Sequence, residues 1–367
     1  MKRLYFLDNL RWMTVILVII YHVFYIFNCS GVPSNFTTQG IPCFDAFLAF
    51  VYPWFMILMF AIAGCSARYA LQKRSGKEFI KDRNHRIFIP CIAGMFAYGW
   101  ITGYIGFLYS PDAESMKVLP KFVLGIIILL SGTGPLWFGQ LLFVICLILM
   151  LIRKLDKNQK LLKLGEKANL PVLIALIIPV WLSSMVLIMP YVTIYRLGIY
   201  GFTFLLGYYI LSHESVQERL AKFAIWLITP AILLGIAVTI RYYGENYAAD
   251  AVLQSPFINA YAWLMTIALF GLGRKYLNFQ NTFTRFMTSR SQSYYLLHYT
   301  SISLLGWFCI EKLNLPFGIY YLIIALGTAI FLPLVTELFL RIPVLNRLLL
   351  GMTIAKKIKT KKATAGM

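Results

Sequence analysis

Two polar side chains near the start of the chain have the spacing of a membrane-embedded catalytic pair. Arg11 precedes the apolar run Trp12–Phe27, and His22 lies within that run. Their separation makes about three helical turns, so both fall on nearly the same helix face, about 16 Å apart along the axis. Asp8 is placed to orient Arg11 through an i,i+3 ion pair. Because an ionisable residue inside a span marks a functional site by default, we predict His22 as a base near mid-depth.

A pair of arginines stands where the third apolar run begins. Arg83 and Arg86 are one helical turn apart, so both can face one anion. Guanidinium groups suit phosphate because they form bidentate hydrogen bonds. The alternative interpretation is that both arginines are topology charges that extend to lipid headgroups.

Aromatic residues and a second histidine complete the candidate site. Trp137 opens the fourth apolar run, either as an interfacial aromatic or as a wall of the site. Tyr294 and His298 lie on the ninth run, and we expect Trp137 and Tyr294 to contact substrate. His298 is either a hydrogen-bond donor to the reacting groups or a neutral imidazole satisfied between helices. His85 and His213 lie in polar loops and are expected to be solvated.

Composition places these residues in a membrane. The 367 residues are 60% hydrophobic and 13% charged, with a mean hydropathy of +0.73. Such a chain is not a soluble globular domain, and we predict an all-α polytopic membrane protein with about ten transmembrane helices. A further apolar segment, residues 122–130, is too short to cross as a helix. The ten predicted spans are Leu10–Asn28, Ala46–Ala70, Arg86–Tyr109, Leu136–Ile152, Leu170–Met189, Leu197–Leu211, Phe223–Tyr243, Ser255–Leu272, Ser293–Ile310 and Phe317–Phe339.

The charge distribution predicts the topology. The net charge of +20 lies in alternate loops between the apolar runs and in the Lys-rich end of the chain. This pattern indicates positive-inside loops and contacts to anionic lipid, and it argues against nucleic acid as a partner. We therefore expect both termini in the cytoplasm, with a membrane-embedded domain over residues 1–345 and a basic cytoplasmic tail over residues 346–367.

Other reaction classes find little support. Acidic residues are nearly absent from the spans, and the main exception, Glu337, is expected to pair with Arg341. Metal-ligand spacing is absent from the sequence, as are a Ser–His–Asp pattern and a Gly-rich phosphate loop. Cys29 and Cys43 fall in the first outside loop and can form a disulfide in an oxidising space.

These motifs occur together in one known family. The order Leu7-Asp8-Asn9-Leu10-Arg11, ten residues, then His22 resembles the acyltransferase 3 family of integral membrane acyltransferases. Arg83 and Arg86 followed by Pro90, then Leu136-Trp137-Phe138, then Tyr295-Leu296-Leu297-His298, look like its later landmarks, over roughly residues 4–340. The opening is similar to the glucan biosynthesis protein C branch. Gly139 departs from the family, which often has leucine there.

The resemblance implies a reaction. It is the transfer of an acyl group from cytoplasmic acyl-coenzyme A, acetyl or succinyl, to a hydroxyl of a cell-envelope carbohydrate, in a bacterial inner or plasma membrane. His22 is the implied base, and His298 is a second candidate, as a hydrogen-bond donor to the thioester oxygen or to the acceptor. Arg11, set by Asp8, and the Arg83–Arg86 pair hold the donor. Acyl-coenzyme A is then a substrate, and neither a permanently bound cofactor nor a metal is expected.

Two other functions stay open at this level. A polysaccharide or lipid-linked sugar transporter would use the same inner cavity without acyl chemistry, and a receptor-like or scaffolding protein would need neither. Dependence on acyl-coenzyme A distinguishes the enzyme from both. The sequence leaves open the choice between acetyl and succinyl, direct transfer or an acyl intermediate, the acceptor and the oligomeric state.

Overall fold

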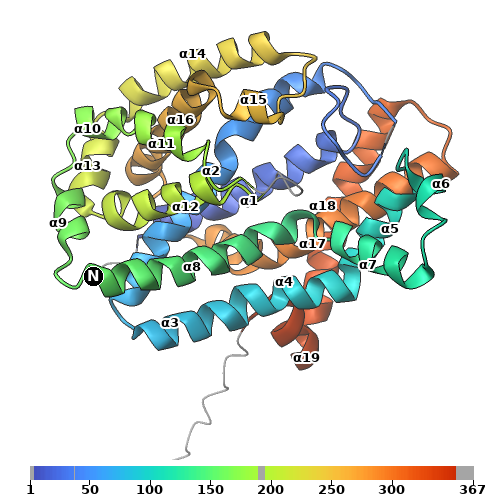
Figure 1. Cartoon of the computed structure of the whole chain (residues 1–367), viewed down its shortest axis with the longest axis horizontal. Coiled ribbons are helices and arrows are strands. Elements are labelled where there is room, and N and C mark those ends of the chain that lie inside the picture. The colour runs from blue at the N-terminus through green and yellow to red at the C-terminus, as the bar shows by residue number, and fades with distance from the viewer. Residues whose placement is uncertain (1–3, 37, 189–194, 353–367) are drawn as a thin grey trace, which may run out of the picture.

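The protein is built from helices packed into one bundle (Figure 1). The computed structural model describes residues 4–36, 38–188 and 195–352, and it contains no β-strand within them. Together with the long apolar helices, this confirms the predicted all-α polytopic membrane fold.

Seven helical segments of the described chain have the length and composition needed to cross a membrane. They are α1 (Tyr5–Tyr25), α2 (Phe44–Leu71), the continuous segment Gly76–Leu108, η3 with α8 (Gly134–Leu155), α14 (Ala224–Tyr242), α16 (Pro256–Tyr276) and α18 (Phe317–Arg341). The segment Gly76–Leu108 contains α3 (Gly76–Arg83), η1 (Asn84–Phe88), α4 (Ile89–Gly94), η2 (Met95–Gly99) and α5 (Trp100–Leu108), where η1 and η2 are π-helical turns.

The other three predicted spans are also helical but differ from these seven. The fifth becomes α10 (Leu170–Ala175) and α11 (Ile177–Ser183), and its last residue, Met189, lies outside the described residues. The sixth is α12 (Leu197–Leu206) followed by η4 (Gly207–Leu211), and both the fifth and the sixth are shorter than a typical crossing helix. The ninth lies inside α17 (Thr282–Lys312), whose first half is rich in hydroxyl and basic side chains.

The short apolar segment 122–130 forms α7 (Lys121–Ser131), which packs beside α5. Its eleven residues span about 16 Å, well short of the hydrocarbon core. A Cβ on Gly103 of α5 would lie 1.9 Å from the Ile128 carbonyl oxygen, so glycine is what allows α5 and α7 to approach so closely. The remaining short elements are α6 (Ala113–Met116), α9 (Lys160–Glu166), α13 (Glu214–Lys222), α15 (Asp250–Leu253), α19 (Pro343–Leu345) and η5 (Asn346–Leu350).

Helix α1 runs through the interior, where it packs against α2, α16 and α17 (Figure 1). Its surroundings explain why a polar residue is tolerated there. Helices α2 and α16 have mostly buried side chains, whereas α14 and α18 turn most of their apolar surface outward. An outward apolar surface suits lipid, so the polar groups of α1 and α17 are enclosed by protein.

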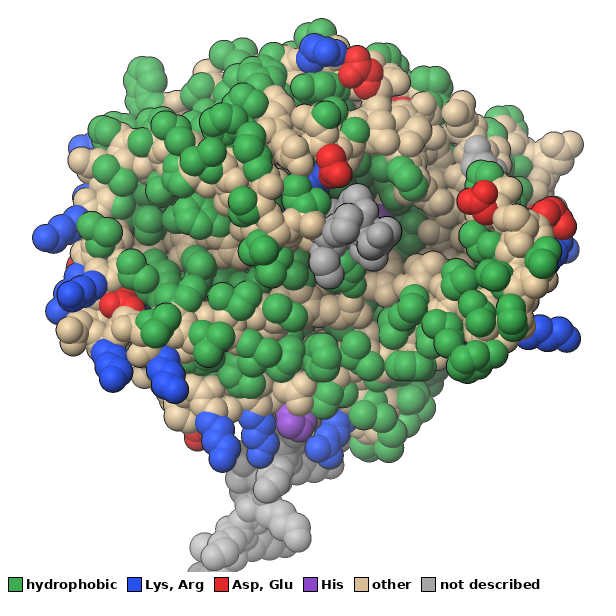
Figure 2. All heavy atoms as spheres, viewed as in Figure 1, with side chains coloured by type: hydrophobic (Ala, Val, Ile, Leu, Met, Phe, Trp, Pro, Cys, Tyr) green, Lys and Arg blue, Asp and Glu red, His purple; other side chains and the backbone are tan. Residues whose placement is uncertain are grey.

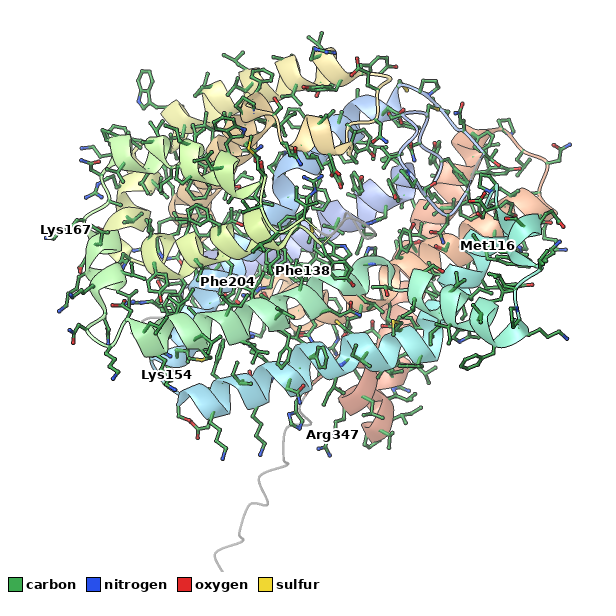
Figure 3. All side chains as sticks on the ribbon, in the orientation of Figure 1. Met116, Phe138, Lys154, Lys167, Phe204 and Arg347 are labelled. Carbon is green, nitrogen blue, oxygen red and sulfur yellow. The ribbon has the colours of Figure 1, made fainter. Side chains whose placement is uncertain are left out.

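Basic side chains gather along the left and lower-left edge of the molecule (Figure 2). We call this the basic end. Lys154 and Lys167 mark it, and Met116 lies at the opposite, or distal, end (Figure 3). The first and last described residues, Leu4 and Met352, each line a cavity that also contains Arg86. That the basic end faces the cytoplasm remains a prediction.

Part of the predicted tail packs against the membrane domain. η5 contacts α4, η1 and α18, and the Gln292 amide donates to the backbone carbonyls of Arg86 and Leu350. Residues 353–367 lie outside the described residues.

Candidate active site

The end of α1 sets the position of His22. The apolar run continues to Asn28, but the helix ends at Tyr25, because the Asn28 side chain bonds the Tyr25 carbonyl and exchanges two hydrogen bonds with the backbone of Val32. His22 therefore lies in the last turn, about 5 Å from the distal end of the helix and about 25 Å from its start. The expected position near mid-depth of the membrane stays a prediction.

His22 and His298 form a hydrogen-bonded pair whose tautomers follow from their neighbours. His22 Nδ1 lies 2.8 Å from the Val18 carbonyl oxygen, and His298 Nδ1 lies 2.6 Å from that of Tyr295. A carbonyl only accepts, so we assign the hydrogen to Nδ1 in both neutral rings. His298 Nε2, 3.2 Å from His22 Nδ1, then accepts from the same N–H that bonds Val18.

This network leaves one basic nitrogen. His22 Nε2 carries a lone pair and forms no hydrogen bond with a described residue. His298 is fully buried with both nitrogens engaged, whereas His22 is only half-buried. If Nε2 takes a proton, the charge is stabilised at Nδ1 by Val18 and His298. His22 thus has the geometry of a base and His298 that of a positioning residue.

A cavity of about 600 Å³ opens at the basic end. Arg11 lines it and donates to Ser66 Oγ at 2.6 Å and to Asp8 Oδ1 at 3.4 Å. The predicted i,i+3 pair of Asp8 and Arg11 is therefore present. These contacts hold the guanidinium at the cavity wall, where it can meet a bound anion.

The mouth of the cavity is strongly basic. Its lining includes five cations, Arg11, Lys73, Arg74, Arg83 and Arg86, against two carboxylates, Asp8 and Asp82. Asp82 joins Arg74 at 3.0 Å and Arg86 at 2.9 Å, and the Arg83 guanidinium lies 5.0 Å from the centre of the Phe79 ring. Helix α3 begins with a capping box between Ser75 and Glu78, which fixes the entry to this arginine-bearing segment.

The inner part of the cavity is apolar and aromatic. Phe138 of α8 and Phe204 of α12 lie in the interior, between the basic and distal ends (Figure 3), and both line the cavity. Trp137 is buried against Tyr200 and Phe60, so it is not an interfacial aromatic, and it lies behind Phe138 rather than on the cavity surface.

Tyr294 is likewise off the cavity surface, whereas its neighbour Tyr295 lines it. The Tyr295 hydroxyl donates to the Pro135 carbonyl at 2.8 Å, and its ring lies 5.5 Å from that of Phe138. Neither histidine lines the cavity. Because the Tyr295 carbonyl also accepts from His298, Tyr295 connects the cavity wall to the histidine pair.

Close packing around position 139 explains why glycine stands there instead of the leucine that is frequent in the family. A Cβ there would lie 2.3 Å from Cys91 Sγ and 3.1 Å from an Ile87 methyl group. Both Gly139 and Cys91 line the cavity. Glycine at 139 thus lets α8 approach the α3–α5 segment, with the Cys91 thiol filling the space of a side chain.

Three further sequence predictions can be compared with the structure. Glu337 pairs with Arg290 on α17 at 2.7 Å, so the expected pairing with Arg341 was wrong; an interhelical partner overrode the local spacing. Cys29 and Cys43 are both free thiols. His213 is half-buried and does not line the cavity, and burial together with the charge of Arg68 lowers its pKa.

The sequence reasoning missed Ser66, Arg74, Asp82 and Tyr295 as parts of the site. The sequence could have indicated Tyr295, since it precedes His298 by three residues, and on a helix such a carbonyl can accept a hydrogen bond from the histidine Nδ1. It could not have indicated Ser66 and Asp82, because their roles depend on how α2 and α3 lie against α1. Among the described residues, His, Cys, Asp and Glu form no group that can hold a metal ion.

These features define a multi-pass helical membrane protein with a basic cavity and, beyond the cavity residue Tyr295, a hydrogen-bonded histidine pair. A family model described as an acyltransferase domain, acyltransferase 3, matches residues 4–342. The match covers nearly the whole chain, so the protein belongs to the acyltransferase 3 family and is a membrane acyltransferase. None of the curated proteins or solved structures compared with it matches.

Proposed function

We propose that this protein transfers an acyl group from cytoplasmic acyl-coenzyme A to a hydroxyl of a cell-envelope carbohydrate, with His22 as the general base. One observation carries the proposal: a cavity with a basic mouth shares a wall residue, Tyr295, with a histidine pair whose hydrogen bonds leave Nε2 of His22 as a free base. The likeness to the glucan biosynthesis protein C branch favours a glucan acceptor and leaves acetyl and succinyl donors as candidates.

The charges at the mouth support an acyl-coenzyme A donor. Coenzyme A carries phosphates at one end and the thioester at the other. Arg83 and Arg86 would bind the phosphates, and Arg11 would hold the pantetheine arm or a phosphate further in. The apolar inner wall, with Phe138, would surround the uncharged part of the donor.

The proposed reaction balances without a further co-reactant. His22 Nε2 takes the proton of the acceptor hydroxyl while that oxygen attacks the thioester carbonyl carbon. The carbon–sulfur bond breaks, and the coenzyme A thiolate takes the proton back from the imidazolium. His298 Nε2 and the Val18 carbonyl hold His22 Nδ1–H throughout, which stabilises the charged intermediate state of the ring. An acyl-imidazole on Nε2 is the alternative route.

Turnover of radiolabelled donor tests the proposal. The full chain, purified and reconstituted in vesicles, should move label from acetyl- or succinyl-coenzyme A to added β-glucan oligosaccharide. Label on the glucan with wild type and none with His22→Gln supports the enzyme. Movement of glucan across the vesicle membrane without any acyl-coenzyme A would instead establish the transporter and overturn the proposal.

A further inference from the structure

The accessible part of His22 lies away from the donor cavity. His22 is half-buried, yet the cavity at the basic end does not include it. Its ring packs against Tyr25 at 5.7 Å and Tyr299 at 5.0 Å, and it lies in the distal turn of α1. The base is therefore reached from the side opposite to the basic mouth.

Aromatic rings line this side in an ordered cluster. Tyr21 stacks on Tyr25 at 5.5 Å and on Tyr52 at 5.9 Å, and its hydroxyl bonds that of Tyr247 at 3.0 Å. Tyr21 and Tyr247 are buried, so they act as support. Tyr25 and Tyr52 are half-buried and present ring surface, and the Tyr52 hydroxyl has no hydrogen-bonding partner among the described residues.

A buried cation lies beside the cluster. Arg196, at the start of α12, is 5% exposed, and its side chain pairs with Asp250, the first residue of α15. Among the described residues, Asp250 is the hydrogen-bonding partner of this guanidinium, so its further N–H groups have no acceptor within that part of the chain. Asp250 follows Tyr247 by three residues, and the Tyr247 ring lies 5.3 Å from that of Tyr52, so the pair lies near the rings.

The surface is hollowed in this region. Figure 2 shows a depression to the right of the centre of the face, where Figure 1 places α15, the beginning of α8 and the end of α1. These elements carry Asp250, the Trp137–Phe138 segment and His22.

We propose that Tyr25, Tyr52 and the Arg196–Asp250 pair bind a neutral sugar unit of the acceptor on the distal side of His22. Aromatic faces pack against the C–H faces of a pyranose, and an arginine beside a carboxylate offers donors and acceptors for neighbouring hydroxyls. The two charges of the pair cancel, so the site favours an uncharged sugar over an acidic one. Its role in catalysis rests on the proposed acyl transfer, whereas sugar binding does not.

Binding and turnover test different parts of this inference. A linear β-glucan hexasaccharide should raise the melting temperature of the purified full chain in detergent, and a glucuronic acid hexasaccharide should raise it less. Asp250→Asn should reduce this shift at the same glucan concentration, and Tyr52→Phe, which keeps the ring, should retain more of it than Tyr52→Leu. Glu245→Gln, which breaks the exposed distal ion pair with Arg241, is the matched control and should leave the shift unchanged.

In vesicles, Asp250→Asn should raise KM for the glucan about tenfold, as expected for loss of a hydrogen bond to a charged group, and leave KM for acyl-coenzyme A unchanged. Asp250 is half exposed, so this change should not prevent folding. The sugar site is overturned if the glucan raises the melting temperature of Asp250→Asn and Tyr52→Leu as much as that of wild type. Equal binding of the acidic sugar would overturn it too. If the wild type shows the glucan-induced rise in melting temperature but no acyl transfer, the proposed reaction is overturned and the sugar site is not.

Discussion

The two sides of the histidine pair differ in charge. On the basic side, five cations face two carboxylates around a cavity that continues into apolar walls. On the distal side, one buried cation is balanced by one carboxylate, and tyrosine rings supply most of the surface. The difference indicates two kinds of recognition. Excess charge suits a polyanionic donor, whereas balanced polar groups beside rings suit a neutral, hydroxyl-rich acceptor.

The comparison also separates the substrates in space. Coenzyme A and a cell-envelope carbohydrate would be present on opposite sides of a membrane, and the histidine pair lies between the two regions. His22 is accessible on the distal side, while Tyr295 and Phe138 separate the pair from the donor cavity. In this arrangement the acyl group travels further than the acceptor hydroxyl, so the thioester must reach past these two rings.

The largest expected effect concerns which side of the membrane each end of the molecule faces, because a labelled position either reacts or does not. Lys157 at the basic end and Lys117 at the distal end are both exposed. With Cys29 and Cys43 changed to serine, Lys117→Cys should react with an impermeant maleimide in intact cells, and Lys157→Cys only after permeabilisation. Labelling of both in intact cells would contradict a cytoplasmic basic end.

The next largest effect is expected at the base. His22→Gln keeps a hydrogen-bonding side chain but cannot accept the hydroxyl proton, so kcat should fall by about 10²–10⁴-fold. KM for acyl-coenzyme A should not change, because the ring does not line the donor cavity. Steady-state kinetics in vesicles measure both. Near-normal turnover at normal expression would reduce His22 to a packing residue.

The partner of His22 should have a smaller effect. His298→Leu removes the acceptor of the His22 Nδ1–H bond, and one hydrogen bond to a charged ring corresponds to about 10–100-fold in kcat. His298→Gln offers an amide oxygen in its place and should retain more activity than the leucine variant. Equal losses in both variants, with KM also raised, would indicate a packing defect instead of positioning.

The sequence predicted the fold better than the arrangement of the side chains at the candidate site. Long apolar runs and loop charges are local properties, so the helices and the Asp8–Arg11 pair followed from them. The position of His22 in the last turn of α1 did not, since a loop interaction of Asn28 ended the helix within an apolar run. Glu337 pairs with Arg290 on a neighbouring helix, and spacing along one helix cannot predict a pair between two helices.

The distal region was also beyond the reach of sequence reading. Tyr52 and Arg196 belong to segments far apart in the chain, and tyrosines are frequent in this protein, with 23 in all. Only packing distinguishes the rings beside His22 from the rest. By contrast, Arg83 and Arg86 of the donor side lie in one short segment, where spacing alone brought them together.

A moderate effect is expected when the donor side loses a cation. Arg83→Ala or Arg86→Ala should raise KM for acyl-coenzyme A about tenfold with little change in kcat, because phosphate contacts stabilise the bound donor and its transition state equally. KM for the glucan should stay constant, in contrast to Asp250→Asn. Lys154→Ala, outside the cavity at the same end, is the control. An unchanged KM for the donor would return both arginines to the lipid-headgroup interpretation.

The smallest effect has the opposite sign and tests the charge argument itself. Asp82 pairs with Arg74 and Arg86 at the mouth, so it competes with a donor phosphate for both guanidinium groups. Such partly exposed pairs contribute only about 0–1 kcal/mol, so Asp82→Asn should lower KM for acyl-coenzyme A by less than about fivefold. The gain should shrink at high salt, which screens the added charge. If Asp82 mainly holds the arginines in place, KM would rise instead, and excess charge would no longer explain recognition at this end.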